Sequence, residues 1–101
     1  MATIKEITVQ ELKEWQASGK DFQLIDVREP NEFAEAEMGG ELIPLGTVTA
    51  NTDKISKDKP VVVHCRSGKR SANAIAVLQM DHGYDNLYNL QGGILAWLDA
   101  Q

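Results

Sequence analysis

Cysteine is almost absent from this chain of 101 residues, and Cys65 is its single representative. One cysteine cannot form an internal disulfide bond. A structural zinc site usually takes four cysteine and histidine ligands, and one cysteine with two histidines falls short of that set unless carboxylates join it. The sequence therefore predicts a fold held together without a disulfide or a metal ion.

Long apolar runs are also missing. The first six residues lack the apolar core of a signal peptide, and no later run approaches the roughly eighteen residues that a membrane-spanning helix needs. Basic residues are scarcer than acidic ones: ten Lys and Arg against fifteen Asp and Glu give a net charge of −5. A surface with a net negative charge repels nucleic acid and anionic lipid. We therefore expect a cytoplasmic protein that binds neither nucleic acid nor membrane.

Linkers, internal repeats and low-complexity stretches are absent as well. Apolar residues make up 43% of the chain and charged residues 25%, values typical of a soluble globular protein. A chain of this length has room for one modest core. Residues 1–101 are thus expected to form a single domain.

Strand-like and helix-like segments alternate along the chain. A capping box, in which Thr8 is followed three residues later by Glu11, predicts the start of a helix that Gly19 ends. The polar segment 47–59 is expected to be a loop with one turn at most. The other expected elements are a strand at 22–27, a turn at 29–31 leading to a short helix near 32–33, strands at 42–45 and 61–64, a helix at 71–82 before Gly83, a strand at 86–90 and a helix at 94–100.

The strand at 61–64 is expected in the middle of a sheet, because its continuous apolar character suits a parallel strand covered on both faces. Pro44 lacks an amide donor and places the far end of its strand at an edge or outside the sheet. The helix at 71–82 is rich in apolar residues and is expected to be mostly buried. Further residues at helical spacing that we expect in the core are Trp15, Leu95, Trp97 and Leu98. The alternation predicts an α/β fold, a parallel sheet with helices on both faces.

Cys65 directly follows this central strand, at its carboxyl end. In open α/β sheets, ligands bind beyond the carboxyl ends of the strands. The polar turn 66–70 leads into a helix, so its consecutive backbone N–H groups can converge on an anion. Such donors favour the ionised thiol, which is the nucleophilic form. Cys65 is therefore a candidate nucleophile, with Ser67, Ser71 and the amide of Gly68 as candidate hydrogen-bond donors to the sulfur that it carries.

Positive charge is concentrated beside this cysteine. Three of the ten basic residues, Arg66, Lys69 and Arg70, fall within five positions of an acidic chain. Their charges oppose the macrodipole at the start of the following helix, at about 0.3–1 kcal/mol per exposed charge. An anion in the turn offsets that cost, and arginine binds oxyanions through two parallel hydrogen bonds. We expect the three side chains to recruit an oxyanionic substrate.

Each of these features has a structural interpretation when taken alone. A lone cysteine at a strand end is commonly a small core residue, and clustered basic residues are commonly a solvated face. The combination of strand, cysteine, cationic glycine-containing turn and helix favours the functional interpretation. His64 is expected to be structural, because neighbouring residues of a strand point to opposite faces. His82, in the last turn of its helix, is expected to be structural too.

Asp26 and Arg28 form a second polar pair at the carboxyl end of a strand. They lie two residues apart, so both point the same way near the edge of the sheet that carries the cysteine loop. They either brace that loop or form an ordinary surface ion pair of little energetic value. The spacing alone leaves both interpretations open.

Four segments of the chain form a recognisable series: Asp26-Val27-Arg28-Glu29-Pro30, Gly39-Gly40-Glu41-Leu42-Ile43-Pro44-Leu45-Gly46, Val63-His64-Cys65-Arg66-Ser67-Gly68-Lys69-Arg70-Ser71 and Tyr88-Asn89-Leu90-Gln91-Gly92-Gly93-Ile94-Leu95-Ala96-Trp97. In their order and spacing, from about residue 3 to residue 100, they resemble a single-domain rhodanese, a sulfurtransferase. The resemblance implies a three-layer domain with a central five-stranded parallel sheet, a persulfide carried on Cys65 and an active-site loop from Cys65 to Arg70. It also implies that Asp26 and Arg28 brace this loop.

One segment departs from the family pattern. Many rhodaneses carry Gly-His-Ile and then Gly-Ala before the Ile-Pro-Leu run, whereas this chain has Glu35-Ala36-Glu37-Met38-Gly39-Gly40 there, without the histidine. The Gly-Gly-x-Leu-Ile-Pro-Leu-Gly form is similar to rhodanese domains attached to adenylyltransferases of molybdopterin and thiamine synthesis. This similarity suggests a role in sulfur delivery.

The resemblance implies transfer of a sulfane sulfur from a donor such as thiosulfate to cyanide or to a thiol, free or on a protein. The persulfide is the expected covalent intermediate, and no cofactor is expected. A module that carries sulfur or docks on a partner without turnover is an alternative that the sequence does not exclude. A cysteine phosphatase is another, but its signature has five residues between cysteine and arginine, whereas Cys65 and Arg70 enclose four. The loop is therefore expected to be too small for phosphate.

Overall fold

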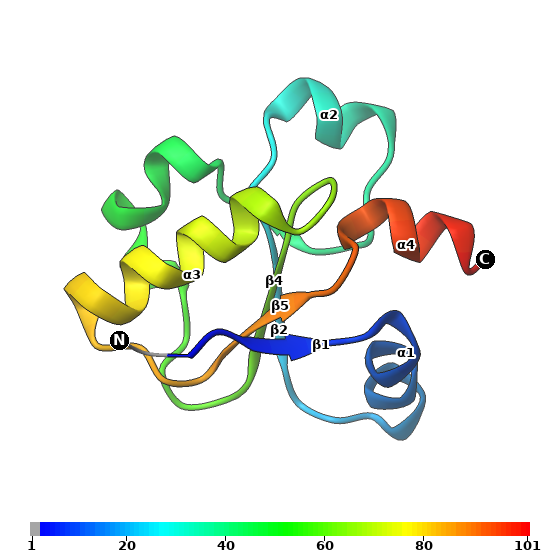
Figure 1. Cartoon of the computed structure of the whole chain (residues 1–101), viewed down its shortest axis with the longest axis horizontal. Helices are drawn as coiled ribbons and strands as arrows, with labels where there is room; N and C mark the ends of the chain where they lie inside the picture. Colours follow the sequence, from blue (N-terminus) through cyan, green and yellow to red (C-terminus); the bar gives the residue numbers. More distant parts are fainter. Residues whose placement is uncertain (1–2) are drawn as a thin grey trace.

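The computed structural model describes residues 3–101 and shows a parallel sheet between two helical layers (Figure 1). The sheet has five strands in the order β1-β5-β4-β2-β3, and all neighbouring strands run parallel. The predicted α/β class and five-stranded parallel sheet are confirmed. The strands are β1 (Lys5–Ile7), β2 (Gln23–Asp26), β3 (Glu41–Leu42), β4 (Val61–His64) and β5 (Leu87–Leu90), and the α-helices are α1 (Val9–Ser18), α2 (Pro30–Glu35), α3 (Lys69–His82) and α4 (Gly93–Asp99).

Strand β4 occupies the centre of the sheet, as its apolar run predicts. All four of its residues are buried, and it pairs with β2 on one side and β5 on the other. At the edge, β3 has only two residues and pairs with β2. Pro44 lies beyond the end of β3, which is one of the two places expected for a residue without an amide donor.

The two faces of the sheet bury separate hydrophobic clusters. Residues that alternate along β4 divide between them, because side chains of a strand point to opposite faces. Val63 packs in the cluster that contains Ile75 and Leu78 of α3, whereas Val62 packs in the cluster that contains Leu12 of α1 and borders Trp97 of α4. Figure 1 shows α3 on one side of the sheet and α1 and α4 on the other. Helices on both faces, as predicted, make this a three-layer domain.

Helix α1 begins and ends where the sequence predicts. The Thr8 hydroxyl accepts a hydrogen bond from the Glu11 amide at 3.1 Å, and the Glu11 carboxylate accepts one from the Thr8 amide at 2.9 Å. This capping box satisfies two amides that the first turn leaves without partners. Gly19 ends the helix in the left-handed region, at φ 72°. None of the helices in residues 3–101 combines the length and the apolar character needed to cross a membrane.

Two helices bury less than the sequence predicts. Helix α3 is amphipathic rather than mostly buried: four residues on one face are buried, while Met80 on the opposite face is 76% exposed. In α4, Ile94 is buried and Trp97 is half-buried, but Leu95 and Leu98 are 45% and 48% exposed, so their assignment to the core is wrong. Ile94 and Trp97 share one helix face at i, i+3 spacing. The two leucines lie one residue further along and point away from the sheet.

Two further segments differ from the prediction. The chain from Leu45 to Lys54, expected to be mostly loop, forms two 3-10 helices, Leu45–Ala50 and Thr52–Lys54. They place Val48 in the core under α3, which explains why this polar stretch is ordered. The short strand β1 has no counterpart among the expected elements. Only its last residue, Ile7, is buried, so its three residues carry no strand pattern of their own.

Candidate active site

The sulfur of Cys65 lies at the end of β4, between the hydrophobic core and the loop that follows. The residue is 1% exposed, and its side chain is part of the cluster under α3. Its Sγ accepts a hydrogen bond from the Gly68 amide at 3.1 Å and faces the Ser71 hydroxyl at 3.4 Å. The thiol is thus both a buried residue and the acceptor of polar donors. An ordinary core cysteine lacks such donors.

Gly68 shapes the loop around the sulfur. It adopts φ 105°, a conformation that a residue with a Cβ rarely takes, and it is the residue before the first turn of α3. This turn points the Gly68 amide back at Cys65. The glycine in the predicted cationic turn is therefore required by the backbone.

The donors around Cys65 change the acidity of its thiol. Burial raises the pKa of Cys65, but hydrogen bonds from the hydroxyl and amide of Ser71 and from the amides of Gly68 and Ser67 outweigh burial. The resulting pKa is lower than that of an ordinary cysteine. A lowered pKa increases the fraction of nucleophilic thiolate at neutral pH.

Asn89 of β5 completes the polar surroundings of the thiol, and it is not among the site residues predicted from the sequence. Its side-chain oxygen accepts a hydrogen bond from the Ser71 hydroxyl at 2.5 Å, and its side-chain nitrogen donates to the Gly68 carbonyl at 3.1 Å. The residue is 5% exposed. Asn89 shares a face of the buried strand β5 with Leu87, two residues earlier. A polar residue in such a buried position is the sequence signal that could have identified it.

The start of α4 holds the backbone of the loop from the other side. The amide of Ile94 donates to the Cys65 carbonyl at 2.9 Å, and the amide of Leu95 donates to the Arg66 carbonyl at 3.2 Å. Gly93 lies so close that a Cβ placed on it would be 2.6 Å from the Cys65 carbonyl oxygen. The glycine pair before this helix therefore allows α4 to supply donors to the loop.

The three cations of the loop have different partners. Arg70 makes a two-pronged ion pair with Glu32 of α2, with N–O distances of 2.7 and 2.9 Å. This contact contributes most to lowering the pKa of Glu32 to about 2, and it raises the pKa of Arg70. Arg66 and Lys69 are exposed, and within residues 3–101 neither makes an ion pair.

Asp26 and Arg28 are a buried pair, so their interpretation as a surface ion pair is wrong. The Arg28 guanidinium lies 2.7 Å from the Asp26 carboxylate, and both side chains are at most 5% exposed. The same guanidinium donates to the carbonyls of Glu32 and Ala36, at 3.3 and 2.6 Å. The pair therefore braces α2. Its connection to the cysteine loop runs through Glu32, which binds Arg70.

The two histidines lie outside the polar shell of the thiol. His64 is fully buried, with its Nε2 3.9 Å from a carboxylate oxygen of Asp26, its register partner on β2. Neither ring nitrogen has a hydrogen-bond partner in the described part of the chain. Burial is the main cause that lowers the pKa of His64. His82 ends α3, at the opposite end of that helix from the cysteine loop.

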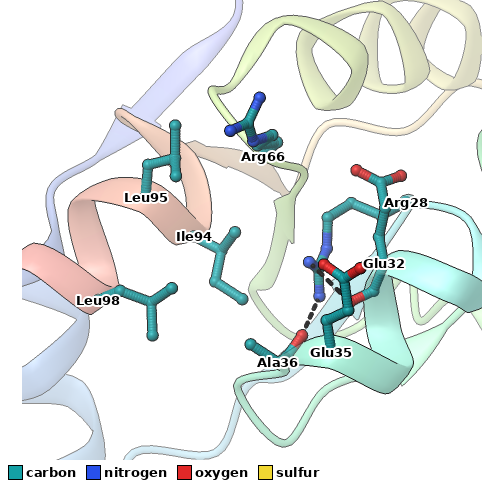
Figure 2. A pocket seen from close by; sticks show the side chains of 8 residues that line it. All are labelled: Arg28, Glu32, Glu35, Ala36, Arg66, Ile94, Leu95 and Leu98. Atoms are coloured by element: carbon teal, nitrogen blue, oxygen red, sulfur yellow. Dashed lines mark hydrogen bonds between the residues drawn. The ribbon is translucent and has the colours of Figure 1, made fainter.

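A cavity of about 210 Å³ opens between α2 and α4. Figure 2 shows Arg66 at one rim, beside Leu95, with Leu98 further along α4 and Glu35 across from it on α2. Arg28 also lines this space, and its guanidinium donates to the Ala36 carbonyl, the contact drawn as a dashed line in Figure 2. The cavity thus brings Arg66, which makes no ion pair in the part of the chain that the structure describes, next to the two exposed leucines of α4.

Known proteins share sequence and fold with this chain along most of its length. The chain is 39% identical over 95 residues to a protein from Allochromatium vinosum named a sulfurtransferase, covering 93% of this chain and 88% of that protein. It is 31% identical over 101 residues to the thiosulfate sulfurtransferase GlpE of Shewanella oneidensis, covering 99% and 98%. A crystal structure of a rhodanese-related protein from Thermoplasma volcanium has a TM-score of 0.83 at 28% identity and covers 95% of this chain and 92% of that one.

These relatives are matched along nearly their whole length, so the likeness is not confined to the cysteine loop. The sequence model of the rhodanese-like domain family matches residues 8–100 of this chain, from the capping box of α1 to the end of α4. The match includes the buried thiol and the donors that surround it. The chain therefore belongs to the rhodanese-like domain family.

Proposed function

We propose that this protein transfers a sulfane sulfur through a persulfide on Cys65. The observation that carries the proposal is the geometry of the thiol: its sulfur accepts a hydrogen bond from the Gly68 amide at 3.1 Å inside a turn that lowers its pKa. The names of the relatives support the same class of reaction. Thiosulfate is the donor we propose, since one relative is named for it.

The reaction proceeds in two displacements. The Cys65 thiolate attacks the outer sulfur of thiosulfate and forms a new S–S bond, while the original S–S bond breaks and sulfite leaves with the bonding electrons. An acceptor, cyanide or a thiolate, then attacks the outer sulfur of the persulfide and releases the Cys65 thiolate. Two separate displacements are the form expected of covalent catalysis. No second cysteine is present to resolve the persulfide, so the acceptor comes from outside the chain.

The residues around the thiol have distinct roles in this proposal. The amides of Ser67 and Gly68 and the hydroxyl of Ser71 stabilise negative charge on the sulfur before and after loading. Arg66 and Lys69 attract the anionic donor, because no carboxylate within residues 3–101 forms an ion pair with either of them. Arg70, which Glu32 neutralises, is assigned instead to holding the loop against α2.

A second candidate is sulfur transfer between proteins, without appreciable turnover of free thiosulfate. It is favoured by one observation: Leu95 and Leu98 are exposed beside the cavity that Arg66 lines, which gives a protein partner an apolar contact next to the loop. In this case Cys65 still carries the persulfide. The two candidates differ in which donor loads it.

Loading with thiosulfate tests the proposal directly. Incubation of the purified protein with thiosulfate is expected to add the mass of one sulfur atom, measured by intact mass spectrometry. Because Cys65 is the single cysteine, Cys65→Ser is expected to remain unmodified. A wild-type protein that stays unmodified with thiosulfate but is loaded by a persulfidated protein would establish the second candidate. An adduct that persists in Cys65→Ser, or Cys65-dependent hydrolysis of an aryl phosphate without loading, would overturn the proposal.

A further inference from the structure

The hydroxyl of Ser71 has two acceptors and one proton. Its oxygen lies 2.5 Å from the side-chain oxygen of Asn89 and 3.4 Å from the Cys65 sulfur. A hydroxyl donates one hydrogen bond and accepts others through its lone pairs. Ser71 is fully buried, and no other acceptor for its side-chain proton is seen in residues 3–101. Only one of the two contacts can therefore be a donation from Ser71 at a given moment.

The orientation of the Asn89 amide settles which end faces Ser71. The amide nitrogen lies 3.1 Å from the carbonyl oxygen of Gly68, which can only accept a hydrogen bond. The amide oxygen must then face Ser71, and it also can only accept. The Ser71 hydroxyl therefore donates its hydrogen bond to the Asn89 side-chain oxygen, which is the nearer of its two acceptors.

From this arrangement we propose that Asn89 is a positioning residue, which competes with the Cys65 sulfur for the single hydroxyl proton of Ser71. While Cys65 is a thiol, the chain of donors runs from S–H to the Ser71 oxygen and from the Ser71 O–H to Asn89. Ionisation releases the thiol proton to solvent and turns the Ser71 O–H from Asn89 to the sulfur. The buried oxygen of Asn89 then loses its donor. The free-energy cost of this unsatisfied acceptor arises only when Cys65 is ionised, so it disfavours the thiolate relative to the thiol.

Asn89 is therefore expected to oppose the ionisation of Cys65 through Ser71. Asn89→Leu can neither accept the hydroxyl proton nor compete for it, so the proton becomes available to the thiolate at no cost. We expect the thiolate fraction below the midpoint pH to rise about five- to tenfold, the effect of roughly one hydrogen bond. The inference deepens the proposed function, because the same thiolate receives the sulfur.

Charged groups near this network also act on the thiolate. They are Arg66, Lys69 and Arg70 after the cysteine, Glu32 of α2, which pairs with Arg70, and Asp26 and Arg28, which lie at the end of β2. His64 precedes Cys65 and points to the other face of the sheet. Substitution of Asn89 or Ser71 by an uncharged residue leaves all of these groups in place. Their effect therefore cancels when variants of the two positions are compared.

The test is the pH profile of alkylation of Cys65 by iodoacetamide in four proteins: wild type, Asn89→Leu, Ser71→Ala and the double variant. The midpoint pH reports ionisation independently of how accessible the sulfur is. Asn89→Leu changes the midpoint pH by one amount when Ser71 is present and by another when Ser71 is replaced by alanine. We expect the change to be more negative when Ser71 is present. Loss of the Asn89 bond to Gly68 is common to both backgrounds and cancels in this comparison. The same shift in both backgrounds, or a relative rise, would overturn the inference.

Two further variants guard against a change of fold. Asn86, just before β5, also donates side-chain hydrogen bonds to two carbonyls, those of Ser56 and Lys59, but lies outside this network. Asn86→Leu is the matched control and is expected to leave the midpoint unchanged. If Asn89→Leu does not fold, Asn89→Asp keeps the acceptor and is expected to raise the midpoint more in the presence of Ser71 than in the Ser71→Ala background. Alkylation needs no sulfur donor, so this test and the thiosulfate test fail independently.

Discussion

The arginine and lysine side chains that follow Cys65 are in different electrostatic states. Arg70 is neutralised by the Glu32 carboxylate, with which it shares two hydrogen bonds. Arg66 and Lys69 are exposed and make no ion pair within residues 3–101. In a chain with a net charge of −5, these two side chains supply local positive potential beside the cysteine loop, where the proposed anionic donor would bind.

Arg66→Ala is therefore expected to slow persulfide formation with thiosulfate more than with an uncharged sulfur donor. The expected loss with thiosulfate is about three- to tenfold at low ionic strength, because one exposed charge acts through a screened interaction. The measurement is the initial rate of loading by mass spectrometry with each donor. Lys54→Ala, which removes an exposed charge on the second 3-10 helix, is the control. Equal losses with both donors would show that Arg66 does not act by its charge.

Helix α4 supports the cysteine loop because its first turn approaches the loop backbone closely. Its amides of Ile94 and Leu95 donate to the carbonyls of Cys65 and Arg66. Gly93 makes this approach possible, since a Cβ there would lie 2.6 Å from the Cys65 carbonyl oxygen. The contact is made by backbone on both sides, so a flexible side chain cannot move away to relieve it.

Gly93→Ala is expected to destabilise the protein by about 1–3 kcal/mol more than Gly83→Ala. Both glycines adopt the left-handed conformation, at φ 60° and 69°, so the backbone strain of alanine is similar in the two variants. The space around Gly83 is open, since no heavy atom of the described residues 3–101 lies within 4 Å of an added Cβ. Urea unfolding measures the two free energies. Equal losses would contradict the close contact between α4 and the loop.

At the scale of the whole molecule, the buried charged groups of residues 3–101 lie at one place, where the carboxyl ends of β2 and β4 approach α2. Asp26 and Arg28 neutralise one another there, and His64 lies beside them with Nε2 3.9 Å from the carboxylate. Burial keeps the imidazole neutral by lowering its pKa, against the attraction of Asp26. The folded state therefore excludes a proton that the unfolded chain binds readily.

This exclusion predicts how stability depends on pH. The unfolded imidazole binds its proton near pH 6.5, and the folded one only at lower pH, so the unfolded state binds more protons between these values. Stability is expected to be fully present above about pH 6.5 and to fall below it by up to about 1.4 kcal/mol per pH unit. Urea unfolding at a series of pH values measures this slope. His64→Gln should remove the loss of stability below about pH 6.5 that His64 causes. His82→Gln, at the end of α3, should keep that loss. Equal slopes of stability against pH in the two variants would refute the assignment to His64.

The sequence predicted most of the fold, and it indicated the centre of the candidate site, because the relevant signals are local. The apolar run of β4 identified the central strand, and the capping box and Gly19 identified the limits of α1. Cys65 was predicted to be a candidate nucleophile from its place after that strand and before a glycine-containing turn. Each of these properties depends on neighbouring residues, whose preferences survive in the folded protein.

The tertiary structure alone decided which groups these residues meet. Asn89 lies 24 positions from Cys65, and the pairing of β5 with β4 brings it beside Ser71 and the loop. Arg70 is neutralised only because α2 places Glu32 against it, and Leu95 faces solvent because the close approach at Gly93 turns the Ile94 face of α4 to the sheet. Spacing along a chain shows what one segment can present. Distances between segments, and hence the charge and proton that reach a buried thiol, depend on how the whole sheet and its helices pack.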